Sequence, residues 1–143
     1  MLARRPVEYD RLRLLDLYLL FPEFARAIRL PRSALAWRRR LPVRANQYWS
    51  TCDRLLLFRQ MTPIQKCALS LLEATGLIAQ DPGSRQWSVV NGQHPIVTSA
   101  VERNREDGVV VAFLAEVLLP LRLTGRQGLK ARTGLMEWRY DEA

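Results

Sequence analysis

The sequence contains few of the residues from which catalytic and metal centres are built. Its 143 residues include one histidine, His94, and two cysteines, Cys52 and Cys67. The cysteines stand fifteen positions apart, and no CxxC or HxxxH spacing occurs, so a zinc site is not expected. The phosphate-binding pattern GxxxxGK[ST] is also absent. With no reactive motif, the sequence predicts a protein that is not an enzyme and has no cofactor.

The sequence also lacks a hydrophobic run long enough to cross a membrane. A spanning helix needs about 20 apolar residues, whereas the longest apolar run, 109–121, is interrupted by Glu116 and Pro120. Two arginines near the start are not followed by the apolar segment of a signal peptide. These patterns predict a soluble cytoplasmic protein with no membrane contact. In that compartment the cysteines are expected to be buried thiols rather than a disulfide.

Lysine is scarce, although the net charge is +8. Only Lys66 and Lys130 are lysines among 22 basic residues, so arginine carries the charge. Arginine favours polyanions and planar pairing with acidic protein surfaces. The strongest basic cluster follows Trp37 and consists of Arg38, Arg39, Arg40 and Arg44. We expect this cluster to bind double-stranded DNA or an acidic partner. The alternatives are a solvated helix face and a compositional bias towards arginine.

Proline divides the N-terminal third of the chain into short predicted helices. Leucine at helical spacing predicts a helix over 10–20, with Asp10 as its N-cap. Further helices are predicted over 22–30 and 33–40, because each ends at a proline that cannot continue it. A longer helix is predicted from Asn46 to about Gln60.

The stretch Thr62-Pro63-Ile64-Gln65 has the pattern of a capping box with proline at the first helical position. The helix that it opens is predicted to bury an apolar stripe made of Ile64, Cys67, Ala68, Leu71 and Leu72. The outward face would then consist of Gln65, Lys66, Leu69, Ser70 and Glu73. That face has one charge of each sign and is partly apolar. It therefore fits a protein contact better than base reading, and Leu69 is predicted at a protein interface.

The periodicity changes after Gly76, which is expected to end this helix. Short strands are predicted over 77–79 and 86–90, joined by a turn at 81–84. A helix pair followed by a hairpin is typical of a winged helix-turn-helix. The predicted fold is therefore mainly α with a small β-hairpin, in a single domain spanning 1–143. Its parts would be a winged-helix-like core at 46–90, N-terminal helices at 1–45 and a C-terminal helical packing segment at 91–143.

The last third is expected to be helical up to Pro120. A short helix is predicted over 98–104, and one over 106–119 is apolar almost all round, which places it in the core or an interface. Glycine-rich turns follow, with a last short helix or strand over 135–140. Trp138 and Arg139 in this tail are predicted at a protein interface.

Three stretches of the chain carry a family resemblance: RPVEYDRLRLLDLYLLFPEFARAIRLP, MTPIQKCALSLLEATGLI and GLKARTGLMEWRYD. Together, from about Arg5 to Asp141, they resemble the middle components of bacterial ABC-three-component systems. Those systems, among them the Lamassu type, combine an SMC-like ABC ATPase, an effector and a small winged-helix middle protein. They are regarded as anti-phage or anti-plasmid defence modules.

The resemblance implies a non-catalytic adaptor that links the ATPase to the effector in a defence complex, with DNA as a further contact. It supplies no catalytic residue, because the matching motifs are short patterns of hydrophobic and charged residues. The alternative is a stand-alone winged-helix transcriptional regulator, which would bind a specific duplex tightly by itself.

Overall fold

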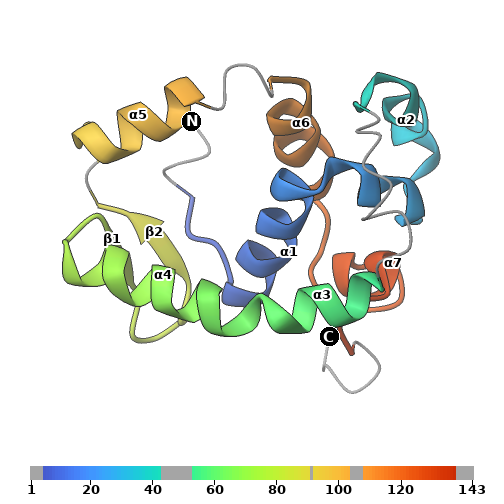
Figure 1. The fold of residues 1–143 in the computed structure, drawn as a ribbon. Coiled ribbons are helices and arrows are strands. Elements are labelled where there is room, and N and C mark those ends of the chain that lie inside the picture. The colour runs from blue at the N-terminus through green and yellow to red at the C-terminus, as the bar shows by residue number, and fades with distance from the viewer. Residues whose placement is uncertain (1–4, 43–52, 91, 104–107, 138–143) are drawn as a thin grey trace.

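The computed structural model describes residues 5–42, 53–90, 92–103 and 108–137. Helices dominate this part of the chain, and one two-stranded antiparallel sheet accompanies them (Figure 1). The predicted combination of a mainly helical fold with a small hairpin is confirmed. Within the described ranges, no helix combines the length and apolar character that crossing a bilayer requires.

Helix α1, Tyr9–Leu20, forms nearly where leucine periodicity predicts it, and Leu14, Leu17 and Tyr18 are completely buried. Its N-cap is Glu8, not Asp10, so that detail of the prediction was wrong. The Asp10 carboxylate instead lies 3.1 Å from the buried ammonium of Lys130. The acidic residue at the start of α1 therefore links the two ends of the chain.

The segment after α1 forms shorter and more tightly wound helices than predicted. The expected helix over 22–30 is a 3₁₀ helix, η2, Pro22–Ala27, and the one over 33–40 divides into η3, Arg32–Ala34, and α2, Trp37–Arg40. Between η2 and η3 the chain is extended, and Arg29 N–H donates to the carbonyl of Arg132 at 3.0 Å. That long-range bond competes with continuation of a regular helix.

Helices α3, Arg54–Gln60, and α4, Thr62–Ala74, run end to end as one rod (Figure 1). The rod begins at Asp53, whose carboxylate accepts from the N–H groups of Leu55 and Leu56. Met61 joins the two helices with helical backbone angles, donating to Leu57 at 3.0 Å and accepting from Gln65 at 2.9 Å.

This continuity corrects the expected helix pair. Pro63 lacks an N–H but sits where the helix tolerates that loss, so the ladder continues around it. Over residues 53–90, no turn separates a first helix from a second one, and the predicted helix-turn-helix is therefore not seen. The beginning of the helix predicted from Asn46 lies outside the described residues.

The hairpin follows α4 as predicted. Gly76 has a φ of +76°, and the N–H groups of Gly76 and Leu77 donate back to Glu73 and Leu72, which is a Schellman ending. Strands β1, Ile78–Gln80, and β2, Trp87–Val89, then pair antiparallel with Ile78 opposite Val89.

The turn of the hairpin forms at 81–84, where the Asp81 carboxylate accepts from the backbone and the hydroxyl of Ser84. The left-handed residue is Arg85, with a φ of +57°, rather than the glycine of the turn. Val7 exchanges two backbone hydrogen bonds with Trp87, at 2.7 and 2.8 Å. The chain start thus extends the hairpin on one edge and leads straight into α1.

Four helical elements complete the described chain. Helix α5, Pro95–Arg103, is followed by α6, Gly108–Phe113, which passes into a π-helical turn, η4, Leu114–Leu118; α7 is Leu129–Thr133. The predicted burial of the apolar helix is confirmed, since Val110, Phe113 and Leu118 are at most 1% exposed. The helix or strand predicted over 135–140 was wrong in its described part, because 135–137 belong to neither.

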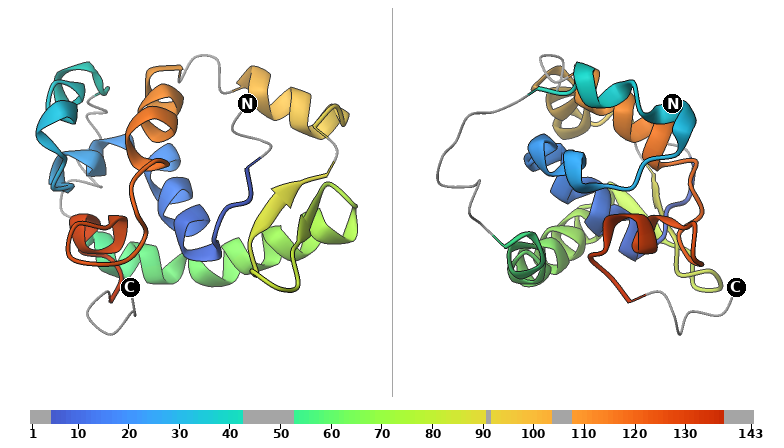
Figure 2. Two further views of the ribbon diagram at one scale, coloured as in Figure 1. Left: turned by 180° about the vertical axis from the view of Figure 1, so that it is seen from behind. Right: turned by 90° about the vertical axis from the view of Figure 1, so that its right-hand side faces the viewer.

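The main core forms around α1, which packs against η2 and the η4 turn, and residues of α6 and α7 complete it (Figures 1 and 2). Among the described residues 53–90, only Phe58 and Met61 are buried members of this core cluster, and the partly buried Leu55 and Leu57 pack against it. The hairpin and most of α4 therefore extend outward from a body built by the two ends of the chain. This arrangement leaves much of the α3–α4 rod uncovered.

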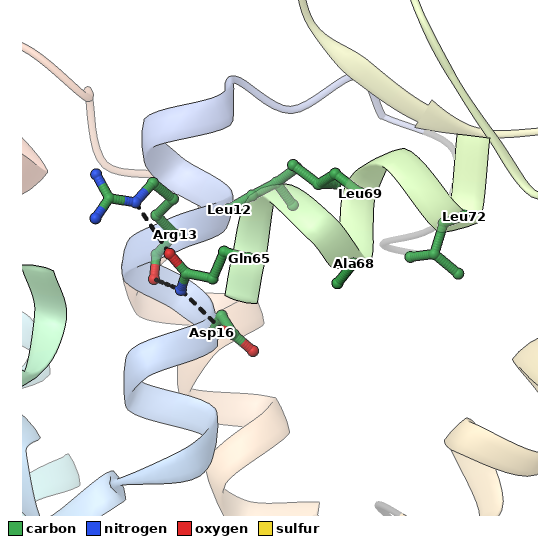
Figure 3. Close-up of a pocket in the computed structure, with 7 residues that line it drawn as sticks. All are labelled: Leu12, Arg13, Asp16, Gln65, Ala68, Leu69 and Leu72. Atoms are coloured by element: carbon green, nitrogen blue, oxygen red, sulfur yellow. Dashed lines mark hydrogen bonds between the residues drawn. The ribbon is translucent and has the colours of Figure 1, made fainter. Parts of the chain in front are cut away.

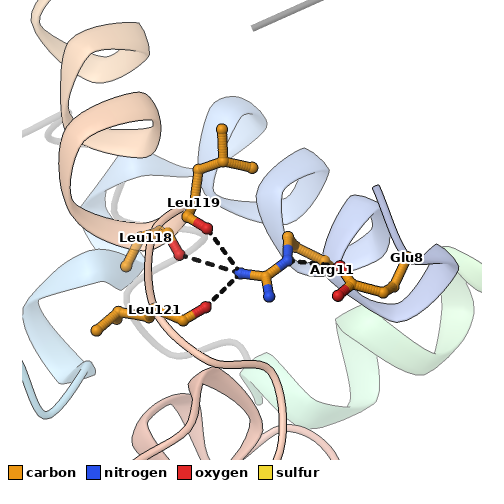
Figure 4. A network of polar contacts seen from close by, with 5 residues as sticks. All are labelled: Glu8, Arg11, Leu118, Leu119 and Leu121. Atoms are coloured by element: carbon orange, nitrogen blue, oxygen red, sulfur yellow. Dashed lines mark hydrogen bonds and ion pairs between the residues drawn. The ribbon is translucent and has the colours of Figure 1, made fainter. Parts of the chain in front are cut away.

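Arg11 of α1 connects these parts through a buried guanidinium (Figure 4). Its Nη1 donates to the carbonyls of Leu118, Leu119 and Leu121 at 3.5, 2.9 and 2.6 Å, and its Nε donates to Glu8 at 2.7 Å. These carbonyls lie at and just after the end of the π-helical turn, where regular helical pairing stops; the Leu118 carbonyl also accepts from the N–H of Leu121 at 3.3 Å. A charged donor satisfies them and holds α1 against the end of η4.

Glu8 keeps this guanidinium paired. Burial raises the pKa of the Glu8 carboxyl. The hydrogen bond from Arg11, its charge and a backbone hydrogen bond lower that pKa by more, so the net pKa is below the usual value. The Glu8–Arg11 pair therefore contributes fully to folding stability when the pH is above the ordinary carboxyl pKa. The contribution is lost as the pH falls through the lowered one.

We expect Arg11→Ala to lower the free energy of unfolding by about 2–4 kcal/mol, because it leaves buried carbonyls without a donor. Arg26→Ala is the matched control, since Arg26 is exposed, and should change stability by less than about 0.5 kcal/mol. Urea unfolding followed by circular dichroism measures both. Equal stability of the two variants would contradict a structural role for Arg11.

Candidate functional site

In the described part of the chain, side chains that could act as nucleophiles, acids, bases or metal ligands do not cluster into a reactive centre. No group of three or more His, Cys, Asp or Glu residues lies close enough there to hold a metal ion. The His94 ring accepts from the N–H of Ile96 at 3.2 Å and thereby caps the start of α5. The candidate sites are therefore surfaces, and the main ones lie along the α3–α4 rod.

The structure reverses the predicted orientation of α4. Ile64 and Leu71, expected to be buried, are 71% and 64% exposed, and Cys67 is an exposed free thiol. Gln65, expected to face outward, is buried at 8% exposure. The prediction assumed that the more apolar stripe faces inward. Polar partners on α1 select the other face instead.

Those partners are Arg13 and Asp16, which both form hydrogen bonds with the Gln65 side chain (Figure 3). The Gln65 amide nitrogen donates to the Asp16 carboxylate at 2.9 Å, while its oxygen accepts from Arg13 Nε at 3.0 Å. Arg13 also donates to the Thr62 hydroxyl at 2.6 Å and stacks over the Phe58 ring. The expected capping box is therefore wrong: Thr62 and Gln65 both bond to α1 rather than to each other.

An apolar groove runs between α1, α4 and the hairpin. One pocket of about 200 Å³ contains the Gln65 network at one side (Figure 3), and a second of about 220 Å³ reaches Trp87. Both pockets are lined by Leu12, Leu69 and Leu72. Leu69, predicted at a protein interface, is thus half-buried in this groove rather than at the outermost face.

The uncovered side of the rod presents a mainly apolar row, interrupted by the polar Gln60 and called here the α3–α4 stripe. Its members are Leu56, Gln60, Ile64, Cys67 and Leu71. Their spacing of 4, 4, 3 and 4 places them along one face of a helix. All five are exposed, and Leu56 retains 53% of its surface. Large exposed side chains in such a row are uncommon for a surface that contacts only water.

The predicted basic cluster is only partly a surface feature. Arg38 donates to the carbonyl of Ile28 at 2.9 Å, so it supports the fold. Arg39 is exposed, and the exposed Arg40 stacks at 4.0 Å over the Trp37 ring, which in turn packs on Phe113. Arg39 and Arg40 are therefore the members positioned to meet a partner. Arg44, like Trp138 and Arg139, lies outside the described residues.

The sequence analysis missed the exposed stripe, although the sequence contains a signal for it. The apolar residues of α4 cover more than one face, because Leu69 and Leu72 lie roughly a third of a turn around the helix from Ile64 and Leu71. An arc this wide exceeds what one packing contact buries. Reading it as a single buried stripe hid the second apolar face.

Together the fold and these surfaces define a small helical protein with apolar surface left uncovered in the described chain. A family model described as ABC-three component (ABC-3C) system Middle Component 5 matches residues 1–141. The chain therefore belongs to this family of middle components, as the resemblance implied. No curated protein and no solved structure gives a significant match.

We expect Gln65→Ala to destabilise the protein by about 1–3 kcal/mol, since it removes the donor to the Asp16 carboxylate and the acceptor of Arg13 Nε in a half-buried site. The neighbouring Lys66→Ala, at an exposed position, should change stability by less than about 0.5 kcal/mol. Thermal and urea unfolding distinguish the two. Equally small losses in both variants would favour the orientation of α4 that the sequence predicted, in which Gln65 and Lys66 both face outward.

Proposed function

We propose that this chain is a non-catalytic adaptor that links an SMC-like ABC ATPase to an effector in a cytoplasmic anti-phage or anti-plasmid defence complex. The observation that carries the proposal is membership of the middle-component family over residues 1–141. A middle component works among other proteins of its system, and the uncovered α3–α4 stripe is a surface of the kind that protein partners bury.

The use of polar side chains supports an adaptor rather than an enzyme. Arg11 is occupied with backbone carbonyls, Lys130 with Asp10, and Gln65 with Asp16 and Arg13. Each of these polar groups joins one part of the fold to another. This leaves the described side chains arranged for support of a surface rather than for proton transfer or nucleophilic attack.

DNA is a secondary partner in this proposal. Arg39 and Arg40 offer charge to phosphates, which is a contact without base reading. The outer face of α4 instead presents Ile64 and Leu71, and these side chains cannot read base edges by hydrogen bonding. The observations therefore favour the adaptor over the stand-alone regulator.

The direct test is co-expression of the chain with the ATPase and the effector encoded beside it. We expect a three-protein complex that survives gel filtration, and an isolated chain that binds duplexes weakly and without regard to sequence. An isolated chain that binds one duplex tightly and ignores the ATPase would favour the regulator. Turnover of a substrate by the purified chain, lost in His94→Ala, would favour an enzyme.

For the DNA contact, we expect Arg39→Glu with Arg40→Glu to weaken duplex binding several-fold at about 0.1 M salt and to reduce its salt dependence. Arg38 is left intact because it supports the fold. Arg85→Glu with Arg103→Glu, both at exposed positions, is the charge-matched control. Fluorescence anisotropy against salt concentration measures both variants, and equal binding would remove Arg39 and Arg40 from the DNA contact.

A further inference from the structure

The apolar arc of α4 is wider than its internal contacts need. Gln65, Leu69 and Leu72 face α1 and the groove, and they supply the packing that holds the helix on the body. Ile64 and Leu71 lie on another side and remain mostly exposed. Ala68 lies between the two sides and lines the groove edge, so apolar surface continues from the groove to the stripe.

The geometry of the α3–α4 stripe fits a helix better than a strand or a loop. The rod from Arg54 to Ala74 is about 30 Å long at the helical rise per residue. Along it, Ile64, Cys67 and Leu71 alternate intervals of three and four, which is the spacing at which two helices interlock side chains. A straight ridge of this kind matches the apolar seam of a second helix lying alongside it.

The edges of the stripe indicate the chemistry of that helix. Arg59 and Lys66 are exposed, are seven positions apart and therefore lie along the same edge. No ion pair joins either of them to another described residue. The opposite edge has the small Ala68, which lets a neighbouring helix approach closely. The exposed Glu73, seven positions beyond Lys66, continues the first edge. That edge is thus basic from Arg59 to Lys66 and ends in one carboxylate, whereas the other edge is small and apolar.

We propose that the α3–α4 stripe docks one amphipathic helix of a partner subunit, with acidic residues on the edge that faces Arg59 and Lys66. This inference rests on the proposed adaptor function and assigns it a surface. A second copy of the chain is a poorer occupant. In an antiparallel two-fold contact the basic edges of two α3–α4 rods would meet, and in any two-fold contact both chains carry a net charge of +8.

The first experiment measures the affinity of the chain for the ATPase and for the effector. Ile64→Glu and Leu71→Glu should each weaken binding to one of them at least about tenfold, because a carboxylate enters the apolar seam. Ile96→Glu on α5 is the matched control, since Ile96 is also exposed, at 52%. It should bind as the parent chain does, and all three variants should keep the parent melting temperature closely.

The second experiment tests the charge of the occupant. Arg59→Glu with Lys66→Glu should weaken the same complex and reduce its salt dependence, whereas Arg85→Glu with Arg103→Glu should not. Two synthetic helical peptides with the same leucine seam serve as direct probes, one with glutamate and one with lysine on its flanks. The acidic peptide should bind at least about tenfold more tightly, and Ile64→Glu should remove that binding.

Cys67 reports directly on the position of the contact, because this exposed thiol lies within the stripe. Its alkylation by iodoacetamide, read by mass spectrometry, should slow at least about tenfold in the complex.

A complex that forms equally well with the stripe variants overturns this inference and leaves the adaptor function standing. If neither the ATPase nor the effector binds, the adaptor function fails and the peptide pair decides the inference. A dimer of the chain that Ile64→Glu dissociates overturns it in favour of a second copy.

Discussion

The buried guanidinium of Arg11 is the interaction on which the rest of the structure depends. It satisfies carbonyls at the end of the π-helical turn η4, more than 100 positions away along the chain. A buried arginine is tolerable only with such partners, so α1 can occupy just one position against α6 and η4. The ion pair of Asp10 with Lys130 reinforces that position. The two ends of the chain therefore form one body.

Once α1 is held there, its other polar side chains determine how the central rod lies. Arg13 offers a hydrogen-bond donor and Asp16 an acceptor. The amide of Gln65 can pair with both, whereas an apolar side chain can pair with neither. Turning α4 so that Ile64 faced inward would leave both groups unpaired in a half-buried site, which costs more than the apolar burial it would add. The exposed stripe is thus a consequence of polar matching between α1 and α4.

The elements that sequence predicts well are those set by local chemistry. Leucine spacing indicates α1, Gly76 marks the end of α4, and Asp81 with Ser84 forms the turn of the hairpin. Long-range contacts decide the rest, and no local pattern reports them. Pro63 does lie in the first turn of α4, as its pattern predicts, but Met61 joins that helix directly to α3. Gln65 resembled a cap but bonds to α1. The basic cluster was found, but the bond from Arg38 to Ile28 was not visible in it.

The same physics explains why this chain leaves apolar surface exposed. A chain of this length buries only part of its apolar surface by itself, and here the two chain ends form the core while most of the central rod stays outside it. Were Ile64 and Leu71 merely incidental, polar residues there would stabilise the soluble state at no cost to the core. Their exposure beside Arg59 and Lys66, which form no ion pair within the described part of the chain, is explained if the rod completes its packing against another protein. The surface that folding leaves uncovered is then the surface through which this middle component assembles.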